Sequence, residues 1–362
     1  METKEEILEN LRKDCNRYSA QELQRFLDNG ILDWNDLLTI YRDWQLRAIY
    51  EWKPQLEYPN DRVNMSQRGI EIYVWGDHGV GKTCFIGAIC SVLRAGGMFI
   101  PQGAYGIQLS HMFWKDVCTL PMATLNNIQV AEFQMVKEKR NTKKHGNTNN
   151  MYVYIIEMPS KIGMAMYKAQ NGISLTDEEH YLLEQTKSYL ENPRNLKIHY
   201  FLMEYENEDE NNRRDDSKEI SQEKYLSSIV DFLNNERLFR HTGIVEVCGL
   251  VTKCDRIDED KASSIVKTFP PSDRPLHAYE YARRSFDSFW RSITDICKNE
   301  KIPTICISYS IGKVFAQNLC EFNPSDTAKV IEHLQSLFNR NFFTRLKEKL
   351  GLTKRPQRPD YI

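Results

Sequence analysis

The sequence predicts an α/β fold, with helices on both faces of a mainly parallel sheet and a small helical region in front of it. Short apolar runs alternate with longer helical patterns from residue 70 onward, which is typical of a parallel sheet. A glycine-rich turn joins the first apolar run to the first of these helices. The segment before residue 53 has helical patterns only.

The amino-terminal region carries start signals for three helices. Thr3 with Glu6 and Ser19 with Glu22 have the spacing of capping boxes, and Asp33 can cap a third helix that runs towards residue 52. Prolines 54 and 59 then interrupt the pattern, which indicates a linker. We therefore expect a helical module over residues 1–52, a linker over 53–68, an α/β domain over 69–350 and a tail over 351–362.

The α/β region is expected to contain six strands and five helices. The strands are expected at residues 70–75, 128–136, 152–156, 198–203, 244–251 and 303–308. The helices are expected at residues 82–94, 176–190, 225–238, 276–298 and 327–350. The polar stretch between the second and third strands predicts a long hairpin loop.

Composition excludes several classes of function. The 362 residues are 41 % hydrophobic and 27 % charged with a net charge of −2, so nothing global favours a nucleic-acid partner. No apolar run is long enough to suggest a membrane span, and the charged start does not resemble a targeting signal. The nine cysteines include no CxxC pair and are expected to be reduced, as in a cytoplasmic protein.

A phosphate-binding loop is the strongest motif. Residues 76–83 read GDHGVGKT and fit G-x-x-x-x-G-K-[ST] without a mismatch, between a strand and a helix. Lys82 is expected to reach the β- and γ-phosphates, and the Thr83 hydroxyl to bind Mg²⁺. The alternative is a glycine-rich turn without a ligand. The candidate binding residues are Gly76, Asp77, His78, Gly79, Val80, Gly81, Lys82, Thr83 and Cys84.

A second motif follows the strand expected at 244–251. Thr252-Lys253-Cys254-Asp255 resembles the N/T-K-x-D motif with which translation-factor and Ras-like GTPases read guanine. The resemblance implies that Asp255 accepts the N1–H and N2–H of guanine, that Lys253 covers the base, and that Thr252 replaces the commoner asparagine. The strand expected at 303–308 continues as Tyr309-Ser310-Ile311-Gly312-Lys313, which resembles the second base-contacting loop of the same family, where a backbone N–H near Ser308 would meet the guanine O6. The alternative is an ordinary charged loop at a strand end.

Over residues 68–350 the chain is similar to bacterial GTPases of the translation-factor class that occur in predicted conflict or defence loci. Residues 120–124, LPMAT, resemble their first switch, which implies that Thr124 closes on Mg²⁺ and the γ-phosphate. Glu157 stands where the family has the aspartate that holds Mg²⁺ through water. Lys82 and Thr124 would then be catalytic, and Thr83, Thr124 and Glu157 would surround the metal. The alternatives are a turn threonine and a surface acid.

The second switch departs from the family pattern D-x-x-G. Residues 157–160 read EMPS, so the glycine that senses the γ-phosphate is absent, and Lys161 stands at the place of the water-orienting glutamine. The loss of these groups is expected to weaken both the switch and hydrolysis.

The leading hypothesis is a switch that binds GTP or GDP with Mg²⁺ and hydrolyses GTP slowly or on stimulation by a partner. A protein partner is expected at the amino-terminal helices, and neither a membrane nor a nucleic acid is expected. Two alternatives stay open: a module that holds GTP without hydrolysis, and an ATP-using signalling ATPase or kinase.

Overall fold

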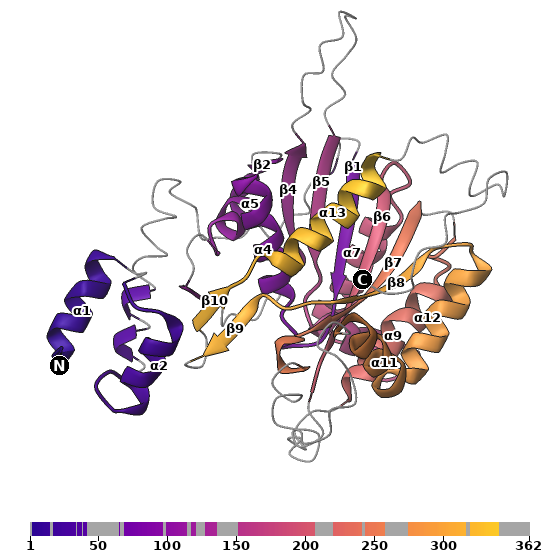
Figure 1. Ribbon diagram of the computed structural model, residues 1–362. Helices are drawn as coiled ribbons and strands as arrows, with labels where there is room; N and C mark the ends of the chain where they lie inside the picture. Colours follow the sequence, from indigo (N-terminus) through magenta and orange to yellow (C-terminus); the bar gives the residue numbers. More distant parts are fainter. Residues whose placement is uncertain are drawn as a thin grey trace, which may run out of the picture.

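The structure is a computed structural model that describes residues 2–14, 17–33, 35–37, 39–41, 65, 69–96, 99–113, 117–120, 127–135, 151–206, 220–240, 243–257, 274–315 and 319–339. Its centre is a seven-stranded sheet in the order β2-β4-β5-β1-β6-β7-β8 (Figure 1). The strands are β1 (Gly69–Trp75), β2 (Phe99–Gln102), β4 (Gln129–Met135), β5 (Met151–Glu157), β6 (Leu196–Glu204), β7 (Ile244–Thr252) and β8 (Thr304–Ser308).

The sheet is parallel from β5 to β8 and antiparallel at the β2 edge. β1 pairs in parallel with β5 on one side and with β6 on the other, and β7 and β8 continue the parallel part. β4 pairs antiparallel with β5, as expected for the predicted hairpin, and β2 pairs antiparallel with β4. The prediction of a mainly parallel sheet is confirmed.

Helices cover both faces and complete a three-layer α/β fold. One face carries α4 (Lys82–Ala95), α5 (Gly103–Ser110) and α13 (Ser325–Asn339) (Figure 1). The other carries α6 (Lys161–Gln170), α7 (Asp177–Leu190), α9 (Gln222–Asn235), α11 (Arg274–Ser285) and α12 (Asp287–Asn299).

Successive side chains of β1 point to opposite faces of the sheet and belong to its two hydrophobic cores. Ile72 and Val74 pack with the α4 face, whereas Tyr73 and Trp75 pack with the opposite face. All seven residues of β1 are buried, which explains its continuous apolar pattern in the sequence.

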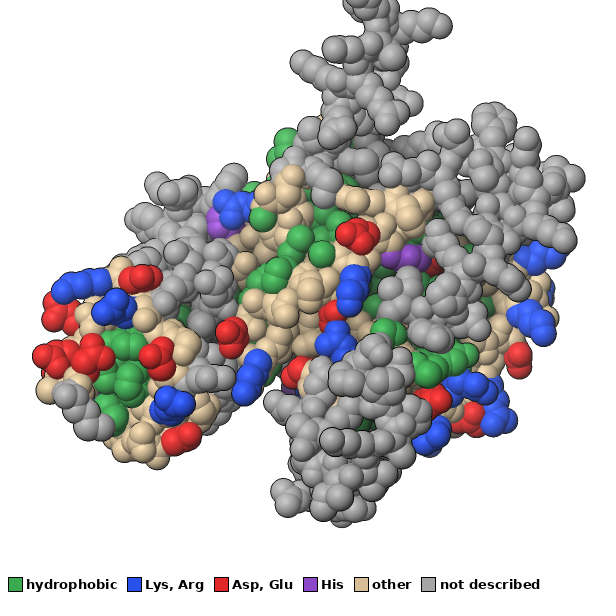
Figure 2. All heavy atoms as spheres, in the orientation of Figure 1, with side chains coloured by type: hydrophobic (Ala, Val, Ile, Leu, Met, Phe, Trp, Pro, Cys, Tyr) green, Lys and Arg blue, Asp and Glu red, His purple; other side chains and the backbone are tan. Residues whose placement is uncertain are grey.

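The amino-terminal helices α1 (Lys4–Lys13) and α2 (Ala20–Asp28) begin with the two predicted capping boxes. Asp33 and Asp36 exchange a third pair of side-chain to backbone bonds, and residues 35–37 and 39–41 are helical, as predicted. These segments form an apolar cluster of their own, which includes Ile7, Leu11 and Leu23. Acidic and basic side chains are interspersed on their visible surface (Figure 2). Residues 42–64 lie outside the described residues, and the division into domains stays a prediction.

Several elements differ from the expected ones. A small sheet, β3 (Val117–Thr119), β10 (Leu319–Phe322) and β9 (Gly312–Phe315), was not expected, and neither were β2, α5 and α6. The helix expected over 276–298 is two helices, because the backbone of the buried Phe286 leaves the helical conformation at φ −128° and ψ 39°. The last helix is described only to Asn339.

Among the helices in the described part of the chain, none is both long and apolar enough to cross a membrane.

Candidate nucleotide-binding site

The phosphate-loop motif lies between a strand and a helix, as the sequence predicts. It starts directly after β1 and ends in the first turn of α4, whose positive end faces the loop. Gly79 and Gly81 have φ values of +80° and +92°, a left-handed conformation that favours glycine. The two glycines therefore shape the tight turn between the strand and the helix.

Lys82 is buried beneath this loop, with 8 % of its surface exposed. Its amine donates to the carbonyl oxygens of Gly76 at 2.6 Å and Asp77 at 2.8 Å. Burial lowers the pKa of Lys82 to about 8, although the charges of Glu157 and Asp77 act in the opposite direction. The amine is thus held by oxygen acceptors inside the loop, and phosphate oxygens can take the same role.

Thr83 and Glu157 meet directly, although 73 residues separate them in the chain. The Thr83 hydroxyl donates to Glu157 Oε1 at 2.6 Å, and the Tyr105 hydroxyl donates to Glu157 Oε2 at 2.5 Å. Burial raises the pKa of Glu157, while these two hydrogen bonds and the charge of Lys82 oppose the rise. Only 1 % of Glu157 is exposed, so the alternative of a surface acid is wrong.

The pair fits the needs of Mg²⁺, because that ion prefers hydroxyl, carboxylate and water oxygens. Thr124, the third predicted metal residue, lies outside the described residues, and its role stays a prediction.

Three other residues in or near the loop make local interactions in the described part of the chain. The backbone N–H of the exposed His78 donates to the Asp77 carboxylate at 2.7 Å, which closes a local turn. Burial raises the pKa of the Cys84 thiol to about 12, so this side chain stays protonated. Lys161 forms an ion pair with Glu178 at the start of α7.

The base-reading motif leaves β7 beside the phosphate loop. The hydroxyl of Thr252 donates to the carbonyl oxygen of Val80 at 2.9 Å, which ties the two motifs together. Lys253 has a left-handed φ of +59° and pairs with Glu204 at the end of β6. Both motifs thus lie at the carboxyl ends of parallel strands.

Asp255 is held by a residue of the loop after β8, a contact that the sequence did not predict. The Ser310 hydroxyl donates to Asp255 Oδ1 at 2.8 Å. Ser308, the residue predicted to mark this loop, is buried at the end of β8, two positions earlier. The strand-end position of Ser308 was the available signal, but only the course of the chain beyond β8 identifies Ser310 as the contact.

The order of strands brings these pieces to one edge. β5 and β6 follow each other along the chain but lie on opposite sides of β1. The order in which strands are added to the sheet therefore changes side at β1. In open α/β sheets, ligands bind at such a point, outside the carboxyl ends of the strands. The ends of β1, β5, β7 and β8 carry the phosphate loop, Glu157, the base motif and Ser310.

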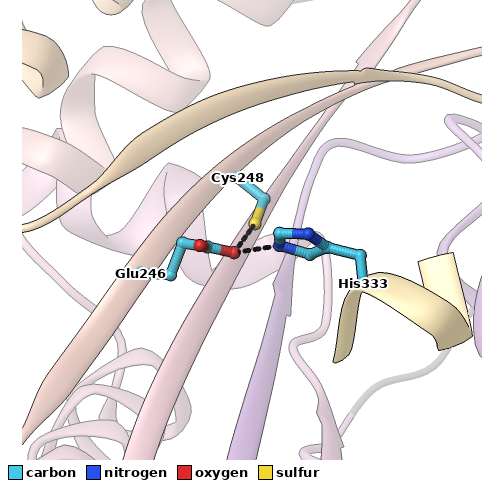
Figure 3. A group of neighbouring side chains, drawn as sticks. All are labelled: Glu246, Cys248 and His333. Atoms are coloured by element: carbon cyan, nitrogen blue, oxygen red, sulfur yellow. Dashed lines mark hydrogen bonds and ion pairs between the residues drawn. The ribbon is translucent and has the colours of Figure 1, made fainter. Parts of the chain in front are cut away.

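A second polar group lies elsewhere and belongs to a different part of the fold. Glu246 and Cys248 on β7 meet His333 of α13 (Figure 3). The atoms with which these three side chains could bind a metal ion all lie within 4.8 Å of one another. Glu246 Oε1 is 2.5 Å from His333 Nε2 and accepts from the Cys248 thiol at 3.4 Å. Six residues of strand, about 20 Å, separate Glu246 from Thr252, so this group does not contribute to the phosphate site.

A scan of known protein families finds none that matches the chain, and a search of curated proteins finds no match either.

Proposed function

We propose that the protein binds a guanine nucleotide with Mg²⁺ and acts as a switch with slow or partner-stimulated GTP hydrolysis. The observation that carries the proposal is the hydrogen bond between Thr252 and Val80, which joins a phosphate loop to a base-reading motif. One nucleotide can then contact both motifs at once.

The phosphate side would hold the charged end of the nucleotide. Backbone N–H groups of residues 76–83 and the start of α4 would surround the phosphates, with the ammonium of Lys82 on the β- and γ-oxygens. Thr83 would bind Mg²⁺ directly and Glu157 would bind its water shell. The ion would neutralise charge on the β- and γ-phosphates.

The base side would select guanine over adenine. A carboxylate at Asp255 can accept from both N1–H and N2–H of guanine, whereas adenine offers no such pair of donors on that edge. A base that covers this carboxylate without offering donors would remove its water and replace it with nothing, which is costly and would favour guanine strongly. Ser310 supports this role because it fixes one carboxylate oxygen at 2.8 Å.

Hydrolysis is expected to be slow without a partner. The segment after Glu157 enters α6 through Pro159 and Ser160 without the glycine of the D-x-x-G pattern. Lys161 is paired with Glu178, so its amine is not directed at an attacking water. The same observations favour the second candidate, a module that holds GTP without turning it over.

Nucleotide competition tests the proposal. A fluorescent GTP analogue is bound to the full-length protein with Mg²⁺ and then displaced by competitors. The concentration needed for displacement should be at least tenfold lower for GTP and GDP than for ATP. Phosphate release over hours then separates the two candidates. Equal displacement by ATP and GTP would contradict guanine selection and favour an ATP-using protein.

A further inference from the structure

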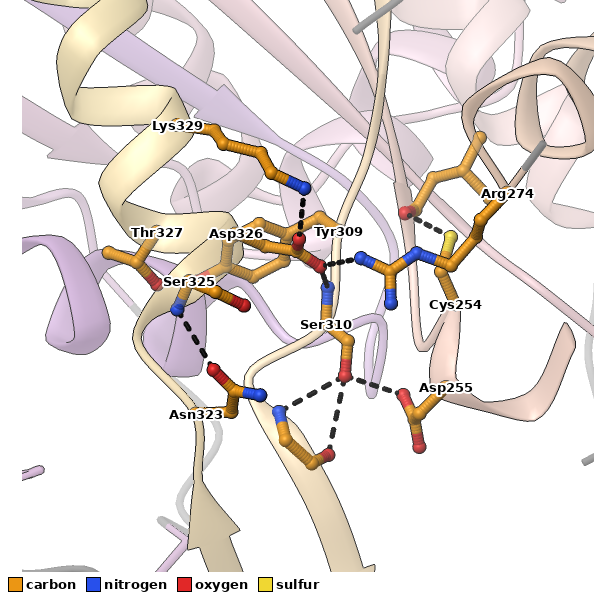
Figure 4. Close-up of polar contacts among 12 residues, drawn as sticks. Cys254, Asp255, Arg274, Tyr309, Ser310, Asn323, Ser325, Asp326, Thr327 and Lys329 are labelled. Atoms are coloured by element: carbon orange, nitrogen blue, oxygen red, sulfur yellow. Dashed lines mark hydrogen bonds and ion pairs between the residues drawn. The ribbon is translucent and has the colours of Figure 1, made fainter. Parts of the chain in front are cut away.

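The base-reading loop is supported by a carboxylate that belongs to no nucleotide-binding motif. Asp326 lies in the first turn of α13 and is 3 % exposed. Its Oδ2 accepts the backbone N–H of Ser310 at 3.0 Å and also bonds the guanidinium of Arg274, the first residue of α11 (Figure 4). Its Oδ1 accepts from Lys329 at 3.1 Å.

Ser310 connects Asp326 to the carboxylate of Asp255. Its hydroxyl lies 2.8 Å from Asp255 Oδ1 and 3.3 Å from the carbonyl oxygen of Gly312, so the shorter bond to Asp255 is the better use of its single proton. The N–H of Gly312 donates back to the same hydroxyl at 3.0 Å. Asp326 thus fixes the main chain of Ser310, and Ser310 fixes the side chain of Asp255.

The orientation of Asp255 matters because guanine presents its two donors in one plane. A carboxylate held in that plane binds without a further loss of rotational freedom. The Ser310 bond occupies one lone pair of Oδ1, and an ionised carboxylate retains acceptor sites on both oxygens for N1–H and N2–H. Asp255 is half-buried, so without Ser310 it could rotate towards water.

We infer that Asp326 is a positioning residue for guanine specificity, which acts through Ser310 on Asp255 and is itself held by Arg274. The inference rests on the proposed function. It adds a determinant that lies 71 residues beyond Asp255 and acts through Ser310.

The substitution Asp326→Asn separates positioning from folding. The amide keeps the size of the side chain but removes the negative charge that strengthens the bonds of Oδ2 to the Ser310 N–H and to Arg274, and it places an NH₂ group where Lys329 needs an acceptor. GTP affinity should fall about tenfold, while affinity for ITP, which lacks the 2-amino group, should fall less. The GTP-to-ITP affinity ratio is the decisive number, because general loosening of the fold would weaken both nucleotides equally.

Three further variants complete the test. Ser310→Ala leaves the backbone N–H on Asp326 but removes the bond to Asp255, so the GTP-to-ITP ratio should fall as it does in Asp326→Asn. The double variant should lose little more than either single one, because both act on one chain of contacts. Lys329→Gln is the matched control, since Lys329 contacts the same carboxylate but its side chain is 53 % exposed; it should change affinity less than about twofold.

The two levels of failure can be told apart. If the unaltered protein prefers GTP over ATP but Asp326→Asn keeps its GTP-to-ITP ratio, the role of Asp326 is refuted and the proposed function stands. If the unaltered protein shows no preference for guanine, the proposed function fails and this inference fails with it.

Discussion

The two halves of the candidate site are built in different ways. The phosphate side is almost continuous in the chain: residues 76–83 form the loop, and Lys82 bonds carbonyl oxygens of that same loop. The base side is assembled from residues that follow β7, follow β8, begin α11 and begin α13. A local motif needs only its own backbone conformation, whereas an assembled one needs the whole carboxyl-terminal half of the fold in place.

This difference predicts how substitutions act. Changes on the phosphate side should affect every nucleoside triphosphate alike, because all of them carry the same phosphates. Changes on the base side should alter the ranking of nucleotides and leave the phosphate contribution intact. Each variant below tests one side of this comparison, or the bond between the sides.

Lys82→Ala should have the largest effect. It removes the ammonium that offsets the β- and γ-phosphates, and affinity for GTP and ITP should fall by at least about 100-fold together. Titration of a fluorescent GTP analogue measures the loss, and the exposed Lys298→Ala is the control for removing a positive charge. Unchanged affinity would rule out the phosphate-loop assignment.

Asp255→Asn should invert the preference between bases. The amide presents a donor where guanine has donors, so GTP affinity should fall by about ten- to 100-fold. Xanthine has a carbonyl at C2 that accepts from the new amide, so affinity for XTP should rise. Competition between the two nucleotides measures the exchange. Equal loss of both would indicate misfolding, and full GTP affinity would show that Asp255 does not touch the base.

Thr83→Ala should reveal the metal on the phosphate side. The variant loses a Mg²⁺ ligand and the hydroxyl that donates to Glu157 at 2.6 Å. GTP binding should weaken about tenfold with Mg²⁺ present and far less in EDTA. The measurement is a pair of titrations on the same preparation. Equal damage under both conditions would mean that Thr83 has another role.

Thr252→Val should have the smallest effect on affinity, and it alters the bond between the phosphate side and the base side. Valine keeps the shape of threonine but leaves the carbonyl oxygen of Val80 without its 2.9 Å bond. A net hydrogen bond contributes about 1 kcal/mol, so GTP and ITP affinities should fall roughly fivefold in parallel. A change in the ratio of the two affinities would place Thr252 on the base side alone.

The sequence predicted the parts of the site that depend on local patterns. The apolar run of β1, the glycines at 79 and 81 and the capping boxes are all local, and the structure has each of them in place. The burial of Glu157 was only one of two alternatives in the sequence. Its contact with Thr83 depends on the parallel pairing of β1 with β5, which periodicity alone does not specify.

Other features could not be predicted because their cause is tertiary. Ser310 lies in a stretch that resembles a base-contacting loop, but Asp326 carries no motif, and the two residues meet only because the segment after β8 and the start of α13 are neighbours in space. The helix break at Phe286 has no glycine or proline to signal it, and packing of the buried ring accompanies the bend. The strands β9 and β10 are four residues each, too short for a reliable alternation.

The buried pair of Glu246 and His333 limits where α13 can lie. Sliding this helix by one turn, about 5.4 Å, would separate the buried Glu246 carboxylate from His333 and leave it the weaker bond from the Cys248 thiol, at a cost of several kcal/mol. His333 is seven residues beyond Asp326, so the same pair also sets the position of that carboxylate along the helix axis, about 10 Å away. The pair therefore fixes α13 along its axis, and with it the distance of Asp326 from the loop after β8 at the candidate site.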